Sequence, residues 1–441
     1  MQLRFDRARP FAHGGDDGRS DLSGSLELSY TPTPQADTIG GSVTNRSPSP
    51  AAVRVVGLVI PVTIEGDTPL RMFSNGYQSW TGTGVLTLGS DRDPSLSEDA
   101  PEAFRAVHHA DQRAARPDEL RSELVTVLAD DAGVVCLGAL GGHRHDTTFR
   151  LRPASSGAPD QAELVVEAFL GGALLAPGAT IVLHDVAIRL AGSGGHSALL
   201  DGWAAACGAA SGARTGAPYQ VGWCSWYHYF ERITEDALRS NLALASEWPF
   251  DVFQLDDGFQ AAIGDWLATN DRFGDLGAVA ADIAAAGRRP GLWLAPFLAA
   301  PHSDLARSHP GWLARTADGT QPLPGWLNEA WGGVVDVLDT SHPEVQEHLE
   351  SVARELAAMG FTYLKLDFTF APGIDGMYHD PSLTPAERVR AGFDAIRRGA
   401  GDDAFILGCG APLGHCIGVV DGMRIGADVA PDWDHDWTFP S

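Results

Sequence analysis

The only lysine of the chain, Lys365, stands two residues before Asp367 in the segment Tyr363-Leu-Lys-Leu-Asp367. All other basic side chains are arginines. Residues two apart on a strand point to the same side, so the ammonium would lie beside the carboxylate and keep it ionised. An ionised carboxylate can act as a nucleophile, and a guanidinium does not replace a compact ammonium in a tight space. The sequence therefore predicts that these two side chains act together.

A second acid, Asp428, ends a later predicted strand and follows Arg424 by four residues. Two carboxyl groups about 5–5.5 Å apart can hydrolyse a glycosidic bond with retention, through a covalent intermediate. The spacing fits ordinary strand-end acids equally well, so both interpretations stay open here. The same holds for Asp256-Asp257-Gly258, which could accept hydrogen bonds from sugar hydroxyls or could form a turn after a strand.

Tryptophan is concentrated in the second part of the chain, where eleven of the twelve lie at or beyond Trp203. Indole faces pack against the C–H faces of sugars, and the indole N–H donates a hydrogen bond. Most of these residues are expected in the core. Trp223, Trp226 and Trp293 lie on predicted strands and are the better candidates for a pocket.

The segment that carries these residues alternates between short apolar strands and amphipathic helices, which predicts a parallel α/β sheet. Ser341 with Glu344, and Thr384-Pro385 with Glu387, match signatures of helix starts. The predicted strands are 220–226, 251–256, 290–296, 361–367, 405–409 and 421–426, and the predicted helices are 234–247, 276–287, 342–359 and 385–398.

Polar residues at the ends of all six strands favour a (β/α)8 TIM-type barrel over a doubly wound sheet, which would gather its site at one crevice. These residues are Trp226, Asp256, Asp257, Trp293, Lys365, Asp367, Cys409, Gly410, Arg424 and Asp428. A closed barrel needs eight strands, and only six are recognised before Ser441. The sequence therefore predicts a barrel that is truncated after about six strands.

The first 200 residues have a different pattern, with many short β-rich runs separated by Gly, Pro, Asn and Asp clusters. This pattern predicts an antiparallel β-sandwich. An Ala-rich stretch at 198–210 is expected to form a linking helix. The predicted organisation is a sandwich domain over 1–200, a linker over 201–218 and a catalytic barrel over 219–441.

Composition excludes several classes of protein. The net charge of −26 disfavours nucleic acid and anionic membranes as partners, and no apolar run is long enough to span a bilayer. Five scattered cysteines and the absence of a secretory h-region predict reduced thiols and a cytoplasmic location. The motifs of dinucleotide-binding, P-loop and serine hydrolase sites are absent from the sequence, and the histidines suggest no convincing metal-ligand set.

Taken together, five motifs resemble the melibiase-like α-galactosidases of glycoside hydrolase family 36, which share a clan with family 27. They occur in the family's order and cover about residues 220–430, and the preceding β-sandwich also fits the family's layout. The motifs are Gly222-Trp-Cys-Ser-Trp226, Leu255-Asp-Asp-Gly258, Tyr363-Leu-Lys-Leu-Asp367, Cys409-Gly-Ala-Pro-Leu413 and Arg424-Ile-Gly-Ala-Asp428.

The resemblance implies a retaining exo-α-galactosidase that acts on α-galactosyl oligosaccharides such as melibiose or raffinose and needs no metal or cofactor. It implies that Asp367 is the nucleophile and that Asp428 is the general acid and then the base. Gly410 stands where family 27 has a glutamate, which favours family 36 and leaves selectivity at the sugar 2-position open. The expected substrate-binding residues are Asp256, Asp257, Lys365, Arg424, Trp226, Cys409 and Gly410, to which the tryptophan pattern adds Trp293.

Two alternative functions remain compatible with these motifs. One is a galactosyltransferase of the raffinose-synthase kind, which would use the same nucleophile and pass the sugar to an acceptor other than water. The other is a non-catalytic sugar-binding fragment with an open barrel. The family is often oligomeric, so a homo-oligomer is also possible.

Overall fold

The computed structural model describes residues 1–14, 20–22, 24–33, 37–92, 118–158, 160–191, 195–426 and 428–429. Their contacts divide the chain into two compact units. The first unit contains Met1–Ala213 and two short segments from later in the chain, Pro381–Glu387 and Leu413–Gly418. The remainder forms the second unit. The domain ranges predicted from the sequence did not assign these two later segments to the first unit.

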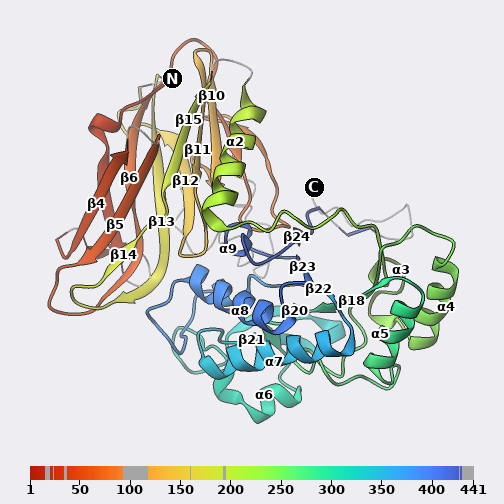
Figure 1. Cartoon of the computed structure of the whole chain (residues 1–441). Coiled ribbons are helices and arrows are strands. Elements are labelled where there is room, and N and C mark those ends of the chain that lie inside the picture. The colour runs from red at the N-terminus through yellow and green to blue at the C-terminus, as the bar shows by residue number, and fades with distance from the viewer. Residues whose placement is uncertain are drawn as a thin grey trace. The chain divides into compact units, whose positions relative to one another are not determined.

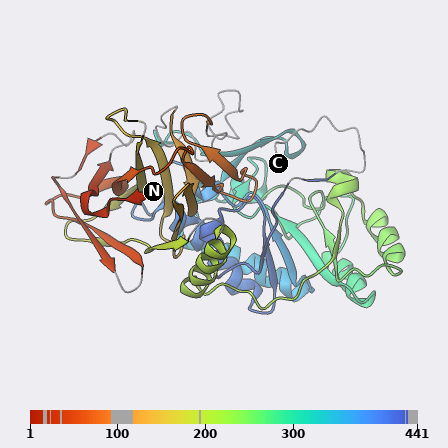
Figure 2. The same ribbon diagram turned by 90° about the horizontal axis from the view of Figure 1, so that it is seen from above.

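The first unit contains two antiparallel sheets, and Figure 1 and Figure 2 show the strands of each sheet side by side. One sheet has the order β3-β2-β6-β13-β12-β9, with β1 paired to β6. Its strands are β1 (Gln2–Leu3), β2 (Arg9–Gly14), β3 (Ser20–Asp21), β6 (Ala51–Thr63), β9 (Leu120–Glu123), β12 (Asp146–Pro153) and β13 (Gln161–Leu175).

The other sheet has the order β14-β5-β15-β11-β10-β7-β8, with β4 paired to β5. Its strands are β4 (Leu26–Thr33), β5 (Thr38–Asn45), β7 (Arg71–Ser74), β8 (Gly84–Thr87), β10 (Val125–Asp130), β11 (Gly133–Ala139), β14 (Thr180–Val182) and β15 (Val186–Ala191). The two sheets share a core, because one apolar cluster includes Ile60 and Phe149 from the first sheet and Leu128 and Leu137 from the second. The prediction that this part of the chain is antiparallel β is confirmed.

The Ala-rich stretch forms helix α2 (His196–Ser211), which lies along β11 and β15 in Figure 1. Leu199 packs in an apolar cluster with Cys136, and the indole N–H of Trp203 donates to the carbonyl of Ala139 at 3.0 Å. This ring covers Gly138, where a β-carbon would come within 2.2 Å of the indole nitrogen. The predicted helix is therefore present, and it belongs to the first unit.

The second unit contains a six-stranded sheet in which every neighbouring pair is parallel. The strand order follows the order of the chain without the reversal that a doubly wound sheet requires. All six predicted strands are confirmed. They are β16 (Gly222–Cys224), β17 (Val252–Leu255), β18 (Arg289–Leu294), β22 (Tyr363–Leu366), β23 (Phe405–Gly408) and β24 (Gly422–Met423).

The four predicted helices are also present, as α4 (Glu235–Ala245), α5 (Leu276–Ala285), α7 (Pro343–Met359) and α8 (Pro385–Ala400). Thr384 and Glu387 form the predicted capping box, because each side chain accepts a hydrogen bond from the backbone N–H of the other. The predicted cap at Ser341 is wrong. The side chain of His342 caps α7 instead, because the hydroxyl of Ser341 donates to Asp339.

The sequence did not predict a small antiparallel sheet that follows β18. It has the order β19-β21-β20, and the 3-10 helix η6 (Glu329–Trp331) joins β20 to β21. Its strands are β19 (Leu298–Ala299), β20 (Pro324–Asn328) and β21 (Gly333–Val337). The short helix α3 (Trp226–Tyr229) was not predicted either, so Trp226 begins a helix and does not lie on the strand β16.

The register of the parallel sheet separates the tryptophans between its two faces. Trp293 pairs with Lys365 across β18 and β22, so both point to the same face. Trp223 pairs with Phe253 and stacks on its ring at 4.2 Å, on the opposite face. Trp223, one of the tryptophans named as candidates for a pocket, therefore points away from the face that carries Trp293 and Lys365.

None of the helices in the described part of the chain combines the length and apolar character that a membrane span requires. The five cysteines are free thiols.

The side chain of Arg397 on α8 ties the beginnings of β23 and β24 together. Its guanidinium donates to the carbonyls of Val419 and Ala404, each at 2.7 Å, and to the carboxylate of Asp421 at 2.5 Å. Asp421 in turn accepts a hydrogen bond from the backbone N–H of Ile406 at 2.9 Å. Arg397 is only 9% exposed. If its guanidinium is removed, water therefore cannot easily reach the carbonyls and the carboxylate to donate hydrogen bonds in its place.

Replacing Arg397 with methionine should lower the free energy of unfolding of the second unit by about 3 kcal/mol, because buried carbonyls and Asp421 lose a charged donor. Urea unfolding followed by tryptophan fluorescence measures this change. The matched control is Arg354→Met, since Arg354 pairs with Glu350 on an exposed helix surface and should contribute less than about 1 kcal/mol. Equal losses in the two variants would contradict the assignment.

Candidate active site

The centre of the site is an ion pair between Lys365 on β22 and Asp256, which follows β17. Nζ of Lys365 lies 2.9 Å from Oδ2 of Asp256, and the two residues are 4% and 1% exposed. Burial alone would lower the pKa of Lys365, but the negative charge of Asp256 raises it well above the usual value. The lone lysine predicted from the sequence is therefore an ammonium held among buried groups.

Two further groups contact the carboxylate of Asp256, and a third holds its backbone. The amide of Gln254 donates to Oδ2 at 2.5 Å, and the thiol of Cys224 donates to the same oxygen at 3.3 Å. The hydroxyl of Ser225 accepts the backbone N–H of Asp256 at 2.9 Å. Burial and the charge of Asp256 raise the pKa of Cys224 well above its usual value, so this group stays a thiol and can donate.

Asp257 is also buried, but its partners are neutral. Oδ1 accepts from the amide of Gln260 at 2.6 Å, and Oδ2 accepts from the indole N–H of Trp331 at 2.8 Å. Burial raises the pKa of Asp257 to about 6, an effect that these two hydrogen bonds oppose only in part. The adjacent carboxyls, Asp256 and Asp257, therefore have different electrostatic environments.

Both carboxylate oxygens of Asp367 accept an N–H group. The indole of Trp293 donates to Oδ2 at 3.1 Å, and the backbone of Phe368 donates to Oδ1 at 2.9 Å. The backbone N–H of Asp367 donates to the carbonyl of Leu294 at 2.8 Å and extends the ladder between β18 and β22. The carboxylate is thus fixed in orientation at the carboxyl end of its strand.

Cys409 and Gly410 lie beside Asp367, at the end of the next strand. The thiol of Cys409 is completely buried, and burial followed by the charge of Asp367 raises its pKa. The carbonyl of Gly410 accepts the backbone N–H of Phe370 at 3.2 Å, which joins the loop after β22 to the loop after β23. Gly410 has a φ of +51°, in the region that favours glycine.

Asp428 and its neighbours form the most exposed part of the site. The carboxylate of Asp428 pairs with the guanidinium of Arg424 and accepts the indole N–H of Trp226 at 2.9 Å. Burial alone would lower the pKa of Arg424, but its electrostatic interactions with the acidic groups of Cys409, Asp428 and Asp367 raise it. The guanidinium of Arg424 therefore interacts electrostatically with both predicted catalytic carboxylates, Asp428 and Asp367.

The structure places the ten predicted site residues on β18 and β22 or in the segments that follow the carboxyl ends of the parallel strands. The candidates predicted from the sequence did not include Gln254, Cys224, Ser225, Gln260 or Trp331. Gln254 lies on β17, two residues before Asp256, so strand alternation could have suggested it. Trp331 is 74 residues from Asp257 in the sequence, and no local sequence pattern indicated that the two side chains are in contact.

Within the described ranges, no three or more His, Cys, Asp or Glu side chains are grouped as metal ligands would be.

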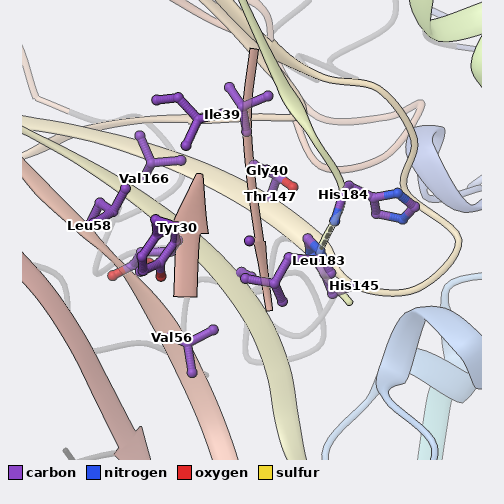
Figure 3. Close-up of a pocket in the computed structure, with 15 residues that line it drawn as sticks. Tyr30, Ile39, Gly40, Val56, Leu58, His145, Thr147, Val166, Leu183 and His184 are labelled. Carbon is purple, nitrogen blue, oxygen red and sulfur yellow. Dashed lines mark hydrogen bonds between the residues drawn. The ribbon is translucent and has the colours of Figure 1, made fainter. Parts of the chain in front are cut away.

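A small cavity lies within the first unit and involves none of the predicted site residues (Figure 3). Its volume of about 30 Å³ is too small for a sugar, and its mainly apolar lining, which includes Ile39, Leu58 and Val166, offers few partners for hydroxyl groups. At one end, Nε2 of His145 accepts the backbone N–H of His184 at 2.9 Å. The cavity therefore offers no alternative substrate site.

Comparison with known proteins finds a family model for melibiase that matches residues 221–372. The α-galactosidase AgaA of Geobacillus stearothermophilus is 26% identical over 152 residues, which are 32% of this chain and 20% of that protein. A probable α-galactosidase C of Aspergillus flavus is 29% identical over 150 residues, 30% of this chain and 18% of that protein. The matched region thus spans about a fifth of the length of these curated relatives.

Among solved structures, the α-galactosidase TtGalA of Thermus thermophilus in complex with stachyose is similar to the chain over both units. The comparison covers 93% of this chain and 80% of that chain, with 26% identity and a TM-score of 0.65. The matched sequence region contains Asp256, Asp257, Lys365 and Asp367, and the structural likeness extends across the preceding β-rich half. The predicted resemblance to the melibiase-like α-galactosidases of glycoside hydrolase family 36 is therefore confirmed.

Proposed function

We propose that this chain has retaining exo-α-galactosidase activity, with Asp367 as nucleophile and Asp428 as general acid and base. The observation that carries the proposal is the fixed carboxylate of Asp367, whose two oxygens accept N–H groups from Trp293 and Phe368. Lys365 lies on the same face of the strand, two residues earlier. The related Thermus enzyme was solved with stachyose, an observation that supports a galactoside substrate.

The proposed substrate is a terminal α-galactosyl group, a neutral sugar that requires hydrogen-bonding groups and an apolar wall. Asp256, Asp257 and Lys365 would bind its ring hydroxyls, the two aspartates at the axial 4-hydroxyl and the 6-hydroxyl. Trp226 would form a wall of the pocket beside Asp428, whose carboxylate its indole contacts. Further contacts would come from Trp293, from Arg424, and from Cys409 and Gly410 near the 2-hydroxyl.

In the first chemical step, an oxygen of the Asp367 carboxylate forms a bond to the anomeric carbon as the bond to the leaving oxygen breaks. Protonated Asp428 gives its proton to that oxygen, and the aglycone leaves as an alcohol. In the second step, water attacks the anomeric carbon and transfers a proton to Asp428. The bond to Asp367 breaks, and α-galactose is released with both carboxyl groups restored.

The architecture that accompanies this proposal is a β-sandwich followed by a (β/α)8-type barrel. The six parallel strands of the second unit follow chain order, as consecutive strands of such a barrel do. The predicted site residues lie where barrel enzymes place their chemistry, at the carboxyl ends of the strands.

The proposal predicts that the chain releases the aryl alcohol from an aryl α-galactoside, and much less from the matching α-glucoside and α-N-acetylgalactosaminide. Asp367→Ala should abolish release, because the covalent step is lost. Proton NMR of the first product should show the α-anomer of galactose. Asp318→Ala, which changes an exposed turn, is the matched control and should remain active. An inverted anomer, or full activity of Asp367→Ala, would exclude the mechanism.

Asp428→Ala should affect substrates according to their leaving group. Activated aryl galactosides need little protonation, whereas an alkyl or sugar leaving group depends on it. We expect kcat/KM to fall about 100-fold more for melibiose than for a dinitrophenyl α-galactoside. The two rates are measured on the same preparation, with melting temperature as the check on folding. An equal loss on both substrates would remove Asp428 from the role of acid.

Asp257 should impose an acid limb on activity, because its ionised carboxylate would accept hydrogen bonds from the substrate. Its pKa is raised to about 6, so kcat/KM for an aryl galactoside should fall as the pH decreases through about 6. In Asp257→Asn this limb should disappear, at a lower plateau. A wild-type limb that persists unchanged in the variant would assign the titration to another group.

The carboxyl group of Asp257 should also make the free energy of unfolding depend on pH. This dependence has the opposite sign to that of the activity. Because the folded pKa of Asp257 lies above the ordinary value of 3.8, the folded state binds this proton more tightly, and stability from this group is lost as the pH rises from about 4 to about 6. Urea unfolding should therefore show a smaller decline over this window in Asp257→Asn than in the wild type.

A further inference from the structure

Phe368, the residue after Asp367, has a backbone conformation that phenylalanine rarely adopts. Its φ is +52°, in the left-handed region where a β-carbon is crowded. Within the described ranges, the only other non-glycine residues with positive φ are Asp37, Leu124 and Phe230. Such strain persists only where the surrounding structure enforces it, and it is concentrated at functional sites.

Hydrogen bonds on both sides of Phe368 fix the chain. Before it, the N–H of Asp367 donates to the carbonyl of Leu294 at 2.8 Å, and after it the N–H of Phe370 donates to Gly410 at 3.2 Å. Between these points the N–H of Phe368 donates to Oδ1 of Asp367 at 2.9 Å. Because the chain is fixed on both sides, a change of φ at Phe368 has to be compensated by rotation of the preceding peptide, so the strained conformation maintains one of the two donors that orient this carboxylate.

The ring of Phe368 lies between two tryptophans of the β20–β21 hairpin. Its centroid is 5.0 Å from Trp331 with the rings at 76°, and 5.2 Å from Trp326 with the rings at 54°. Both are favourable geometries for aromatic pairs. Trp331 also donates its indole N–H to Asp257 at 2.8 Å. The same indole therefore contacts a proposed substrate-binding carboxylate and the residue beside the proposed nucleophile.

We propose that Phe368 is a positioning residue for Asp367. Trp331 and Trp326 hold its ring, the ring keeps the backbone left-handed, and the backbone N–H then orients the carboxylate toward the anomeric carbon. Trp331 links this orientation to Asp257, so the hairpin aligns the binding group and the nucleophile together. The inference rests on the proposed function, because it takes Asp367 as the nucleophile.

The first test compares Phe368→Ala with Phe368→Gly. Alanine removes the ring and keeps the β-carbon, so the backbone should relax to negative φ and withdraw its N–H from Asp367. Glycine also removes the ring but tolerates positive φ. On an aryl α-galactoside, kcat of the alanine variant should fall about 100-fold with KM nearly unchanged. The glycine variant should retain about tenfold more activity than the alanine variant. Equal kcat values, or a loss confined to KM, would overturn the proposal.

The second test asks whether Phe368 acts through Asp367. In Asp367→Gly, azide can attack the anomeric carbon in place of the carboxylate, which gives β-galactosyl azide as the aryl oxide leaves. Adding Phe368→Ala to this variant should leave the azide-dependent rate unchanged within about twofold, because there is no carboxylate to orient. A further loss of about 100-fold would show that the ring acts on the substrate and would overturn the proposal.

Trp312→Phe is the control for general damage to an aromatic cluster. Trp312 lies in the same unit, stacks on His309 at 3.8 Å and donates to Glu344, away from the site. Its activity should match the wild type, and melting curves of all variants report their folding.

A measurement that does not depend on turnover is the indole N–H resonance of Trp293 in protein labelled with ¹⁵N-tryptophan. This N–H donates to Asp367, so its signal should shift in Phe368→Ala and stay near the wild-type position in Phe368→Gly. If the wild-type chain releases no sugar, the proposed function fails while this measurement still decides the inference. An active wild type with no shift in either variant would refute the inference alone.

Discussion

The buried contact between Lys365 and Asp256 sets the geometry on which the site depends. An ammonium and a carboxylate that are almost fully buried are stable only when each has a close partner, because an unpaired buried charge costs several kcal/mol. Lys365 comes from β22 and Asp256 from the end of β17, and β18 lies between these two strands. Gly291 on β18 faces Gln254, where a β-carbon would come within 3.1 Å of that residue. The parallel register therefore has to be correct across three strands for this pair to form.

The loops add what the parallel sheet cannot provide. Strand alternation places Trp293 and Lys365 on one face, but the indole N–H that reaches Asp257 comes from Trp331 in an antiparallel hairpin. This hairpin also packs against Phe368, where the backbone is strained by about 1–3 kcal/mol. Aromatic pairs of the observed kind contribute about 0.5–1.5 kcal/mol each, so the two contacts of Phe368 offset a strain of that size.

Two short segments from the later part of the chain are stabilised within the first unit. The imidazole of His415 lies 2.6 Å from Asp146, and the hydroxyl of Thr384 donates to the carbonyl of Arg144 at 2.6 Å. At Gly142 the backbones approach so closely that an added β-carbon would come within 2.5 Å of Gly414. Along the chain, the segment Leu413–Gly418 separates Gly410 from Arg424. These two segments therefore belong to the first unit, although the residues before and after them along the chain belong to the second.

The sequence by itself was sufficient to predict the six parallel strands, the four helices and the residues at their ends. These features follow from local geometry, because a strand repeats every two residues and a helix every 3.6. The same alternation predicted that Lys365 and Asp367 share one face of the strand, although the ammonium of Lys365 pairs with Asp256 and not with Asp367. The capping box at Thr384 was visible as a four-residue pattern. Motif order added the resemblance to α-galactosidases, which the comparisons confirmed.

Only the tertiary structure revealed the partners that lie far apart in the chain. The contact of Lys365 with Asp256 joins residues 109 positions apart, and Trp331 is 74 positions from Asp257. Trp223 carried the same strand signal as Trp293, yet it faces the opposite side of the sheet. His342 replaced Ser341 as the helix cap because a nearby aspartate bound the serine. Such choices depend on packing between elements, whereas a local sequence pattern reports only the geometry of a single strand or helix.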